Sequence, residues 1–340
     1  MDSESNSGER KRQTPLPYGQ LILLLLIQSS EPITATVIYP FIAQLIRSTG
    51  ITKGEEAKVG YYAGIIESIF FISESLICYQ WGLASDKFGR RPILLLGPLG
   101  LAIAMTGFGL SHSFWSLVVF RAAQGVFNGN IGVSKTVMAE LTDSTNRADA
   151  FMLIPIMWAC GVTIAPMMGG FLAEPAKSWP NFFGRIPLFV DYPYFLPCFV
   201  TGLYAFMTFV IPLFGLKETH PSFKAKTQVL ADTGDLTSQT PLLADRNDHS
   251  YDATRNQSSP TNCTTATTTA APSIFNPTLT IVLVNYSFLT FTDMAYAVII
   301  PILYSTSNSL GGLAFSSKRI GAILDTEKNR SEKDVSDRLS

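Results

Sequence analysis

Seven apolar stretches, each long enough to cross a lipid bilayer, dominate this sequence of 340 residues. A helix needs about 20 apolar residues to span the hydrocarbon core. A chain with several such runs satisfies its backbone inside a membrane only as helices or as a closed barrel, and runs of this length favour helices. The runs lie at 20–46, 60–81, 93–111, 113–138, 149–173, 193–215 and 277–304. We therefore predict an all-α, polytopic, multi-pass integral membrane protein embedded in the lipid bilayer.

The composition supports a membrane protein and argues against other classes. Charged residues make up only 15% of the chain, whereas a soluble domain usually carries about 25%. The net charge of −1 gives no basic excess, so we expect no nucleic-acid partner. The four cysteines are far apart, which indicates neither a disulfide framework nor a metal cluster. Without a phosphate loop, metal-ligand cluster or catalytic triad, we expect no enzyme, no cofactor, no metal and no catalytic residue.

Polar segments divide the chain into parts. Basic residues before the first run and between the second and third runs predict that both segments face the cytosol. The segment 217–276 is rich in Ser, Thr, Asp, Asn and Pro and has too few large apolar residues to form a core. The predicted parts are a cytosolic tail (1–19), a six-helix bundle (20–216), a disordered cytosolic linker (217–276), the start of a second half (277–324) and a polar tail (325–340).

An internal repeat relates the start of the second half to the first. When the chain is shifted by 261 residues, Pro40 falls on Pro301, Gly50 on Gly311 and Gly60 on Gly321. Coincident proline and glycine positions matter because these residues set bends and turns. Two repeats related by an axis along the membrane normal are typical of one class of transporter. After Gly321 the repeat stops at a charged tail, so we expect a truncated second half.

A basic motif lies between the second and third runs. It reads Gly82-x3-Asp86-x2-Gly89-Arg90-Arg91. The motif resembles the loop between helices 2 and 3 of the major facilitator superfamily of secondary transporters. The resemblance implies that the loop 82–92 is a hinge and cytoplasmic gate. In this interpretation Asp86 lies near a helix N-terminus, where the dipole favours an acid, and the two arginines bond across the junction.

The fourth run carries Arg121-x-x-Gln124-Gly125, which also resembles an element of that superfamily. An arginine inside a span costs about 2.5–3.5 kcal/mol on insertion scales, so it normally faces a partner or a wet cavity. Arg121 could bias the proton of a nearby carboxylate, or it could form a purely structural ion pair. Asn128 and Asn130 follow on the same run and could line the cavity or bond between helices.

The fifth run carries Gly161-x3-Ala165-Pro166-x2-Gly169-Gly170. This stretch resembles the element of the antiporter branch, in which a glycine stands at the position of Ala165. Small residues let helix backbones approach closely, and an internal proline permits a bend. The alternative is a packing face that carries no direction of transport.

Four carboxylates inside predicted spans are proton-coupling candidates, together with Arg121. Glu31 lies in the first run, Glu67 and Glu74 share one helix face in the second, and Asp293 lies in the seventh. Asp293 is one residue from the repeat equivalent of Glu31. An ionised carboxylate at mid-bilayer is costly, so we expect these side chains to face the bundle interior. The alternative is that some lie near the interface and are solvated.

The resemblance as a whole implies a major facilitator fold with a complete six-helix first half and about one helix of the second. It is closest to the drug:proton antiporter-like branch. The function implied is secondary active transport of a small-molecule substrate, with protons as the coupled ion, through antiport or efflux by alternating access. The alternative is a non-transporting membrane protein, either truncated or regulatory. The sequence does not distinguish a plasma membrane from a vacuolar membrane.

Overall fold

The computed structural model describes residues 14–220, 277–308 and 311–324. Within these ranges every regular element is a helix, as the apolar runs predicted. The described residues fall into two units, one made of 14–220, 297–308 and 311–324 and the other of 277–296. The predicted tails 1–13 and 325–340, and all of the predicted linker beyond residue 220, lie outside the described residues.

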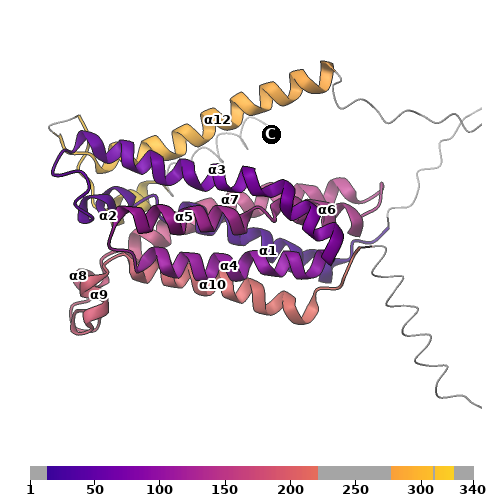
Figure 1. Cartoon of the computed structure of the whole chain (residues 1–340), viewed down its shortest axis with the longest axis horizontal. Coiled ribbons are helices and arrows are strands. Elements are labelled where there is room, and N and C mark those ends of the chain that lie inside the picture. The colour runs from indigo at the N-terminus through magenta and orange to yellow at the C-terminus, as the bar shows by residue number, and fades with distance from the viewer. Residues whose placement is uncertain (1–13, 221–276, 309–310, 325–340) are drawn as a thin grey trace, which may run out of the picture. The chain divides into compact units, whose positions relative to one another are not determined.

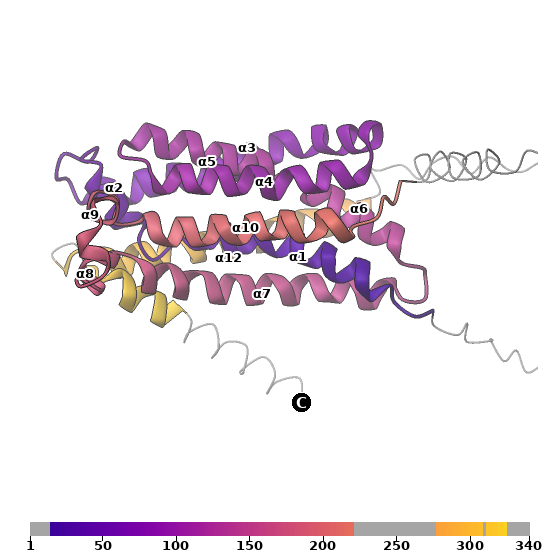
Figure 2. The ribbon, with the colours of Figure 1, turned by 90° about the horizontal axis from the view of Figure 1, so that it is seen from below.

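The long helices of the first unit lie side by side in a bundle (Figure 1). In Figure 2, α4 is seen beside α10, and α1 lies along α7. The helix α4 packs on both α5 and α10, α1 packs on both α7 and α10, and α3 packs on α5. The labelled α-helices of this unit are α1 (Tyr18–Thr36), α2 (Ile42–Ser48), α3 (Ala57–Phe88), α4 (Arg90–Gly109), α5 (Phe114–Asn128), α6 (Ile131–Leu141), α7 (Arg147–Leu172), α8 (Pro175–Ser178), α9 (Pro187–Asp191) and α10 (Phe195–Gly215). The helix α12 (Pro277–Ser305) belongs to this unit from Ala297 onwards.

Two predicted spans are not single helices. Five described helices are long and apolar enough to cross a membrane, namely α3, α4, α7, α10 and the segment Thr280–Ser305. The predicted run 20–46 is divided by residues 37–41, which contain Pro40, and the run 113–138 is divided at Gly129. Proline lacks the backbone N–H of a helical residue, and glycine is a poor helix former. The hydropathy of the sequence does not reveal these breaks, because each covers only a few residues.

The basic motif also differs from prediction, because it is not a loop. The helix α3 continues through Phe88, and α4 begins at Arg90. Gly89 alone separates them, with φ of 99°. This positive φ is the conformation that glycine adopts without steric cost. The expected hinge of 82–92 is therefore a break of one residue.

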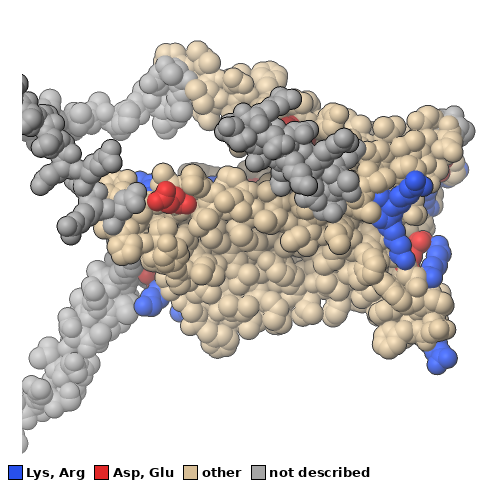
Figure 3. Space-filling model, turned by 180° about the vertical axis from the view of Figure 1, so that it is seen from behind, with Lys and Arg blue, Asp and Glu red and all other residues tan. Residues whose placement is uncertain are grey.

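Charge separates the two ends of the first unit from its middle. Figure 3 shows that Lys, Arg, Asp and Glu gather mainly at the two ends of the face in view. Large apolar side chains, including Leu76, Ile103 and Phe214, are exposed along the helices. We call the end with residues 85–91, 140–147 and 215–220 the proximal end, and the end with α2, α8 and α9 the distal end. The sequence predicts that the proximal end faces the cytosol.

Candidate functional site

Arg121 on α5 is completely buried and is held by several acceptors. Its Nη2 lies 2.9 Å from Glu67 Oε2 on α3 and donates to the carbonyl of Ala35 at 3.0 Å. Its Nη1 donates to Gln124 Oε1 at 2.8 Å. The guanidinium carbon also lies 4.5 Å from the centre of the Phe70 ring, within the range of a cation–π contact. The arginine is therefore paired and hydrogen-bonded, as a buried charge must be.

The local sequence brings these groups together. The helix α1 ends at Thr36, so no later amide of the helix donates to the carbonyl of Ala35. This carbonyl is therefore available to Arg121. A Cβ at Gly125 would collide with the carbonyl of Phe70, so this glycine allows α5 to approach α3. Tyr39, just beyond α1, donates its hydroxyl to Glu67 Oε1 at 2.9 Å. We call Arg121, Glu67, Tyr39, Gln124 and Phe70 the midpoint cluster.

A second group of acids lies near the midpoint cluster in sequence but differs in its partners. The carboxyl groups of Glu31 on α1 and Glu74 on α3 interact with each other and both lie beside Asn128. Lys135 on α6, which is exposed, is a cation that interacts electrostatically with both acids. We call Glu31 and Glu74 the carboxylate pair.

Buried polar atoms without partners lie on the same helices. Gln28, one turn before Glu31, has neither its Nε2 nor its Oε1 hydrogen-bonded, and Ser134 Oγ beside Lys135 also has no partner. An unpaired buried polar atom costs free energy. These helices therefore offer donors and acceptors that a ligand or a water molecule can use.

The basic motif forms a network at the proximal end. Arg90 Nη1 lies 2.6 Å from Asp86 Oδ1, and its Nη2 lies 3.1 Å from Glu140 Oε1 on α6. Arg91 Nη2 donates to the carbonyl of Leu213 at 2.5 Å, which joins α4 to the last turns of α10. Arg90 therefore bonds across the break between α3 and α4, whereas Arg91 bonds to α10.

The acid at the helix N-terminus is Glu218, and the expectation for Asp86 was wrong. Asp86 lies in the last turn of α3, whereas the Glu218 carboxylate accepts from the backbone amides of Arg90 and Arg91 at 2.9 and 3.0 Å. Partial burial would raise the pKa of Glu218, but hydrogen bonds from the backbone amides of His220, Arg91, Arg90 and Thr219 outweigh burial and hold this pKa below its usual value. Glu218 was not among the residues predicted from the sequence, although its position directly after the sixth apolar run was an available signal.

The small residues of α7 allow close helix contacts. A Cβ at Gly161 would lie 2.6 Å from Pro32 on α1, and one at Gly169 would collide with the carbonyl of Val37. A Cβ at Gly170 would lie 2.5 Å from the carbonyl of Ser317, in the second half of the sequence. The carbonyl of Pro166 lies 2.8 Å from the position of a Cβ at Gly321. This face of α7 therefore packs against α1 and against the segment 317–321.

Three other candidate residues have different surroundings. Asn130 donates its Nδ2 to the carbonyl of Leu94 at 3.2 Å and so bonds between helices. A Cβ added at Gly82 would meet no neighbouring atom within 4 Å, so no close approach requires a glycine there. Asp293 is exposed on the part of α12 that belongs to the second unit.

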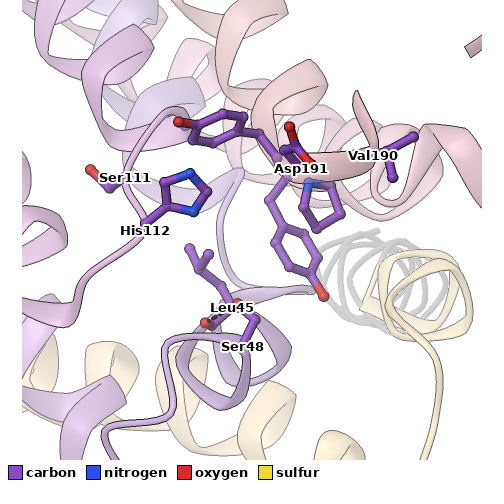
Figure 4. A pocket seen from close by; sticks show the side chains of 10 residues that line it. Leu45, Ser48, Ser111, His112, Val190 and Asp191 are labelled. Carbon is purple, nitrogen blue, oxygen red and sulfur yellow. Dashed lines mark hydrogen bonds between the residues drawn. The ribbon is translucent and has the colours of Figure 1, made fainter. Parts of the chain in front are cut away.

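A polar pocket lies at the distal end, with a volume of about 230 Å³ (Figure 4). Leu45 and Ser48 of α2 form one wall, and Asp191 lies on another. The ring centres of His112 and Tyr192 are 4.1 Å apart. In the described part of the chain, no group of three or more His, Cys, Asp or Glu side chains is arranged to hold a metal ion.

The helical bundle, its apolar outer faces and its buried charged clusters define a multi-pass integral membrane protein. Residues 24–324 match the family described as Major Facilitator Superfamily, and the chain belongs to that family. The all-α fold and the family predicted from the motifs are therefore confirmed.

Individual relatives agree with this assignment. The chain is 31% identical to "Major facilitator-type transporter psiT2" from Psilocybe cubensis over 94% of this chain and 62% of that protein. It is 36% identical to "Major facilitator superfamily multidrug transporter mfsB" from Aspergillus fumigatus over 60% of this chain and 34% of that protein. The chain thus spans less than two thirds of the length of these relatives.

Among solved structures, a bacterial homolog of the human lysosomal transporter Spinster matches the fold. The match has a TM-score of 0.52 and 20% identity, and covers 61% of this chain and 44% of that one. At 20% identity, this similarity supports the fold alone.

Proposed function

We propose that this chain forms part of a proton-coupled antiporter that exports small organic, amphipathic solutes by alternating access. The family consists of transporters, and one relative is named as a multidrug transporter. The observation that carries the proposal is the carboxylate pair, in which Glu31 and Glu74 interact with each other and with the Asn128 amide, and Glu31 is buried.

The carboxylate pair suits proton binding better than Glu67 does. Glu67 already has Arg121 on one oxygen and the Tyr39 hydroxyl on the other, so its negative charge is neutralised and hydrogen-bonded. Glu31 and Glu74 repel each other when both are ionised, and binding a proton to one of them removes that repulsion. A cationic group on a solute would relieve the same repulsion, so proton and solute would compete for one place.

In this proposal Arg121 is a positioning residue. It fixes Glu67 and the end of α1 through the carbonyl of Ala35, and so holds the helix that carries Glu31. The motif around Asp86 and Arg90 acts at the proximal end, where it joins α3, α4 and α6. The small-residue face of α7 packs against α1 and supports the antiporter assignment through its resemblance to that branch.

Proton binding can be tested with the chain in lipid bilayers by infrared titration. Acidification should produce a protonated-carboxyl band that is lost or strongly reduced in Glu31→Gln and in Glu74→Gln. Glu55→Gln is the matched control, because Glu55 forms an exposed ion pair with Lys58 and should leave the band unchanged.

Coupling is tested in proteoliposomes with ethidium as the amphipathic probe. Uptake driven by an imposed pH gradient should fall at least about tenfold in Glu31→Gln, while exchange of ethidium at equal pH persists. Full gradient-driven uptake in both Glu31→Gln and Glu74→Gln, with the carboxyl band intact, would exclude the carboxylate pair as the proton carrier.

A further inference from the structure

Arg47, in the last turn of α2, bonds to both halves of the sequence at the distal end. Its Nη2 lies 2.9 Å from Glu56 Oε2, and its Nε lies 3.1 Å from Oε1 of the same carboxylate. The same Nη2 donates to the carbonyl of Ser305 at 2.9 Å. Arg47 and Glu56 belong to the first half, whereas Ser305 lies 258 residues further along the chain.

Ser305 is the last residue of α12, and its carbonyl is left for Arg47 by the turn that follows. The carbonyls of Leu303, Tyr304 and Thr306 accept from backbone amides of residues 313–315. The carbonyls of a last helical turn have no partner within the helix and carry the negative end of its dipole. A guanidinium is therefore a strong donor for the Ser305 carbonyl, and the bond is charge-assisted.

The bond between Arg47 and Ser305 is largely shielded from solvent and lies next to apolar contacts between the same two halves. Ser305 is buried, and the Arg47 side chain is 27% exposed. Ala297, Val298 and Ile302 pack against the apolar cluster that includes residues of α2 and α3. These apolar contacts are not directional, whereas the Arg47 bond requires one relative position of α2 and the end of α12.

A second cation lies across the same end. Lys318 Nζ is 5.5 Å from the centre of the Trp179 ring, which follows α8. This places a residue of the second half over the loop between α7 and α10. Two cations thus join the halves at the distal end, and the Arg47 contact is the more buried of the two.

We propose that Arg47 is a distal latch, which holds the two halves together at the end away from the basic motif and releases Ser305 when that end opens. The inference rests on the proposed alternating-access cycle, in which every contact between halves at one end must break once. Glu56 makes release inexpensive, because it keeps the guanidinium paired within the first half after Ser305 has moved away. Arg47 would therefore be a positioning residue for the conformational step.

The latch can be tested by measuring distances between two spin labels in lipid bilayers, without any transport assay. One label replaces Lys53 in the first half and the other replaces Leu313 in the second, because both side chains are exposed at the distal end. The background is the full chain with its four native cysteines replaced by serine. A reference pair at Lys53 and His112 lies within the first half and reports general loosening.

We expect one narrow, short distance between halves in the parent and a broad, longer distribution in Arg47→Ala. Arg47→Lys keeps one charged donor and should restore much of the short distance. The matched control Lys58→Ala breaks an exposed ion pair of the same region and should leave both label pairs unchanged.

An unchanged distance between halves in Arg47→Ala would overturn the latch, as would equal broadening of the reference pair. If Arg47→Ala does not insert and fold, Arg47→Gln is read by the same distances and the same criteria. The measurement is independent of proton coupling, so a failed latch leaves the antiport proposal standing, and failed coupling at Glu31 leaves the latch result readable.

Discussion

The midpoint cluster and the network around Arg90 at the proximal end both join acids to an arginine, but they differ in their exposure to solvent. The side chains of Arg121 and Glu67 are 0% and 10% exposed, whereas those of Arg90 and Asp86 are 11% and 59% exposed. Exposed ion pairs contribute about 0–1 kcal/mol because water and salt screen them. Breaking a buried pair costs far more, because the remaining charge has no substitute for its partner.

The two regions also differ in how they distribute their bonds. Arg121 is the centre of its cluster, so each partner depends on it. At the proximal end Glu218 accepts from four backbone amides and Thr219 donates to Glu140 at 2.7 Å, so several side chains hold the same junction. One region therefore depends on a single buried charge, and the other on several partly exposed side chains that hold the same junction.

The largest effect should come from Arg121→Leu, which leaves Glu67 buried without its cation. We expect a loss of about 3–5 kcal/mol in the free energy of unfolding, read by tryptophan fluorescence during denaturation in detergent. Adding Glu67→Gln to this variant should recover part of the loss. The matched control Arg90→Leu should cost less, because water can solvate the carboxylates of Asp86 and Glu140 that lose their partner. Equal losses in the two arginine variants would contradict the distinction between a buried and a partly exposed cluster.

An intermediate effect should separate Gly89→Ala from Gly82→Ala. Gly89 has φ of 99°, and a Cβ there would lie 2.8 Å from Glu218 Oε2, so alanine should cost about 1–3 kcal/mol and displace the acid. Gly82 is inside α3 with no atom near its Cβ position, so alanine should be neutral or stabilise by up to about 1 kcal/mol. The measurement is the thermal unfolding midpoint. If both variants shift it alike, the one-residue break at Gly89 does not control the network.

The smallest effect is expected for Glu218→Gln, and it should depend on pH. Because the folded-state pKa of Glu218 is lowered, its stabilisation is fully present above the unfolded carboxyl value of about 4.3 and is lost as pH falls through the folded pKa. At neutral pH we expect a cost of about 1 kcal/mol or less, since the site is partly exposed. The gap between parent and variant should close on acidification and shrink in high salt. Asp86→Asn is the control, and a gap independent of pH would show that Glu218 does not act through its charge.

Much of the fold was predictable because membrane helices can be recognised from the length and hydropathy of their apolar runs. The structure differed at Pro40 and Gly129, where short breaks interrupt predicted spans, and at the expected loop 82–92, which is helical except at Gly89. For the site, the acids and Arg121 were identifiable from their cost inside a span. Their roles stay predictions. Tyr39 and Lys135 were missed because nothing in their local sequence marks the partners that the fold brings to them. Glu218 directly follows the sixth apolar run, but this position does not specify the amides that it accepts from.

The sequence by itself determined that this chain is a bundle of membrane helices of the Major Facilitator Superfamily. Long apolar runs leave the backbone few other solutions in hydrocarbon. Only the tertiary structure decided which acid meets which partner. Glu67 and Glu74 share a face of α3, yet one is neutralised by Arg121 and the other lies against Glu31. The physical reason is that the charge state of a buried acid depends on groups contributed by neighbouring helices, and the spacing along one helix does not specify which groups those are.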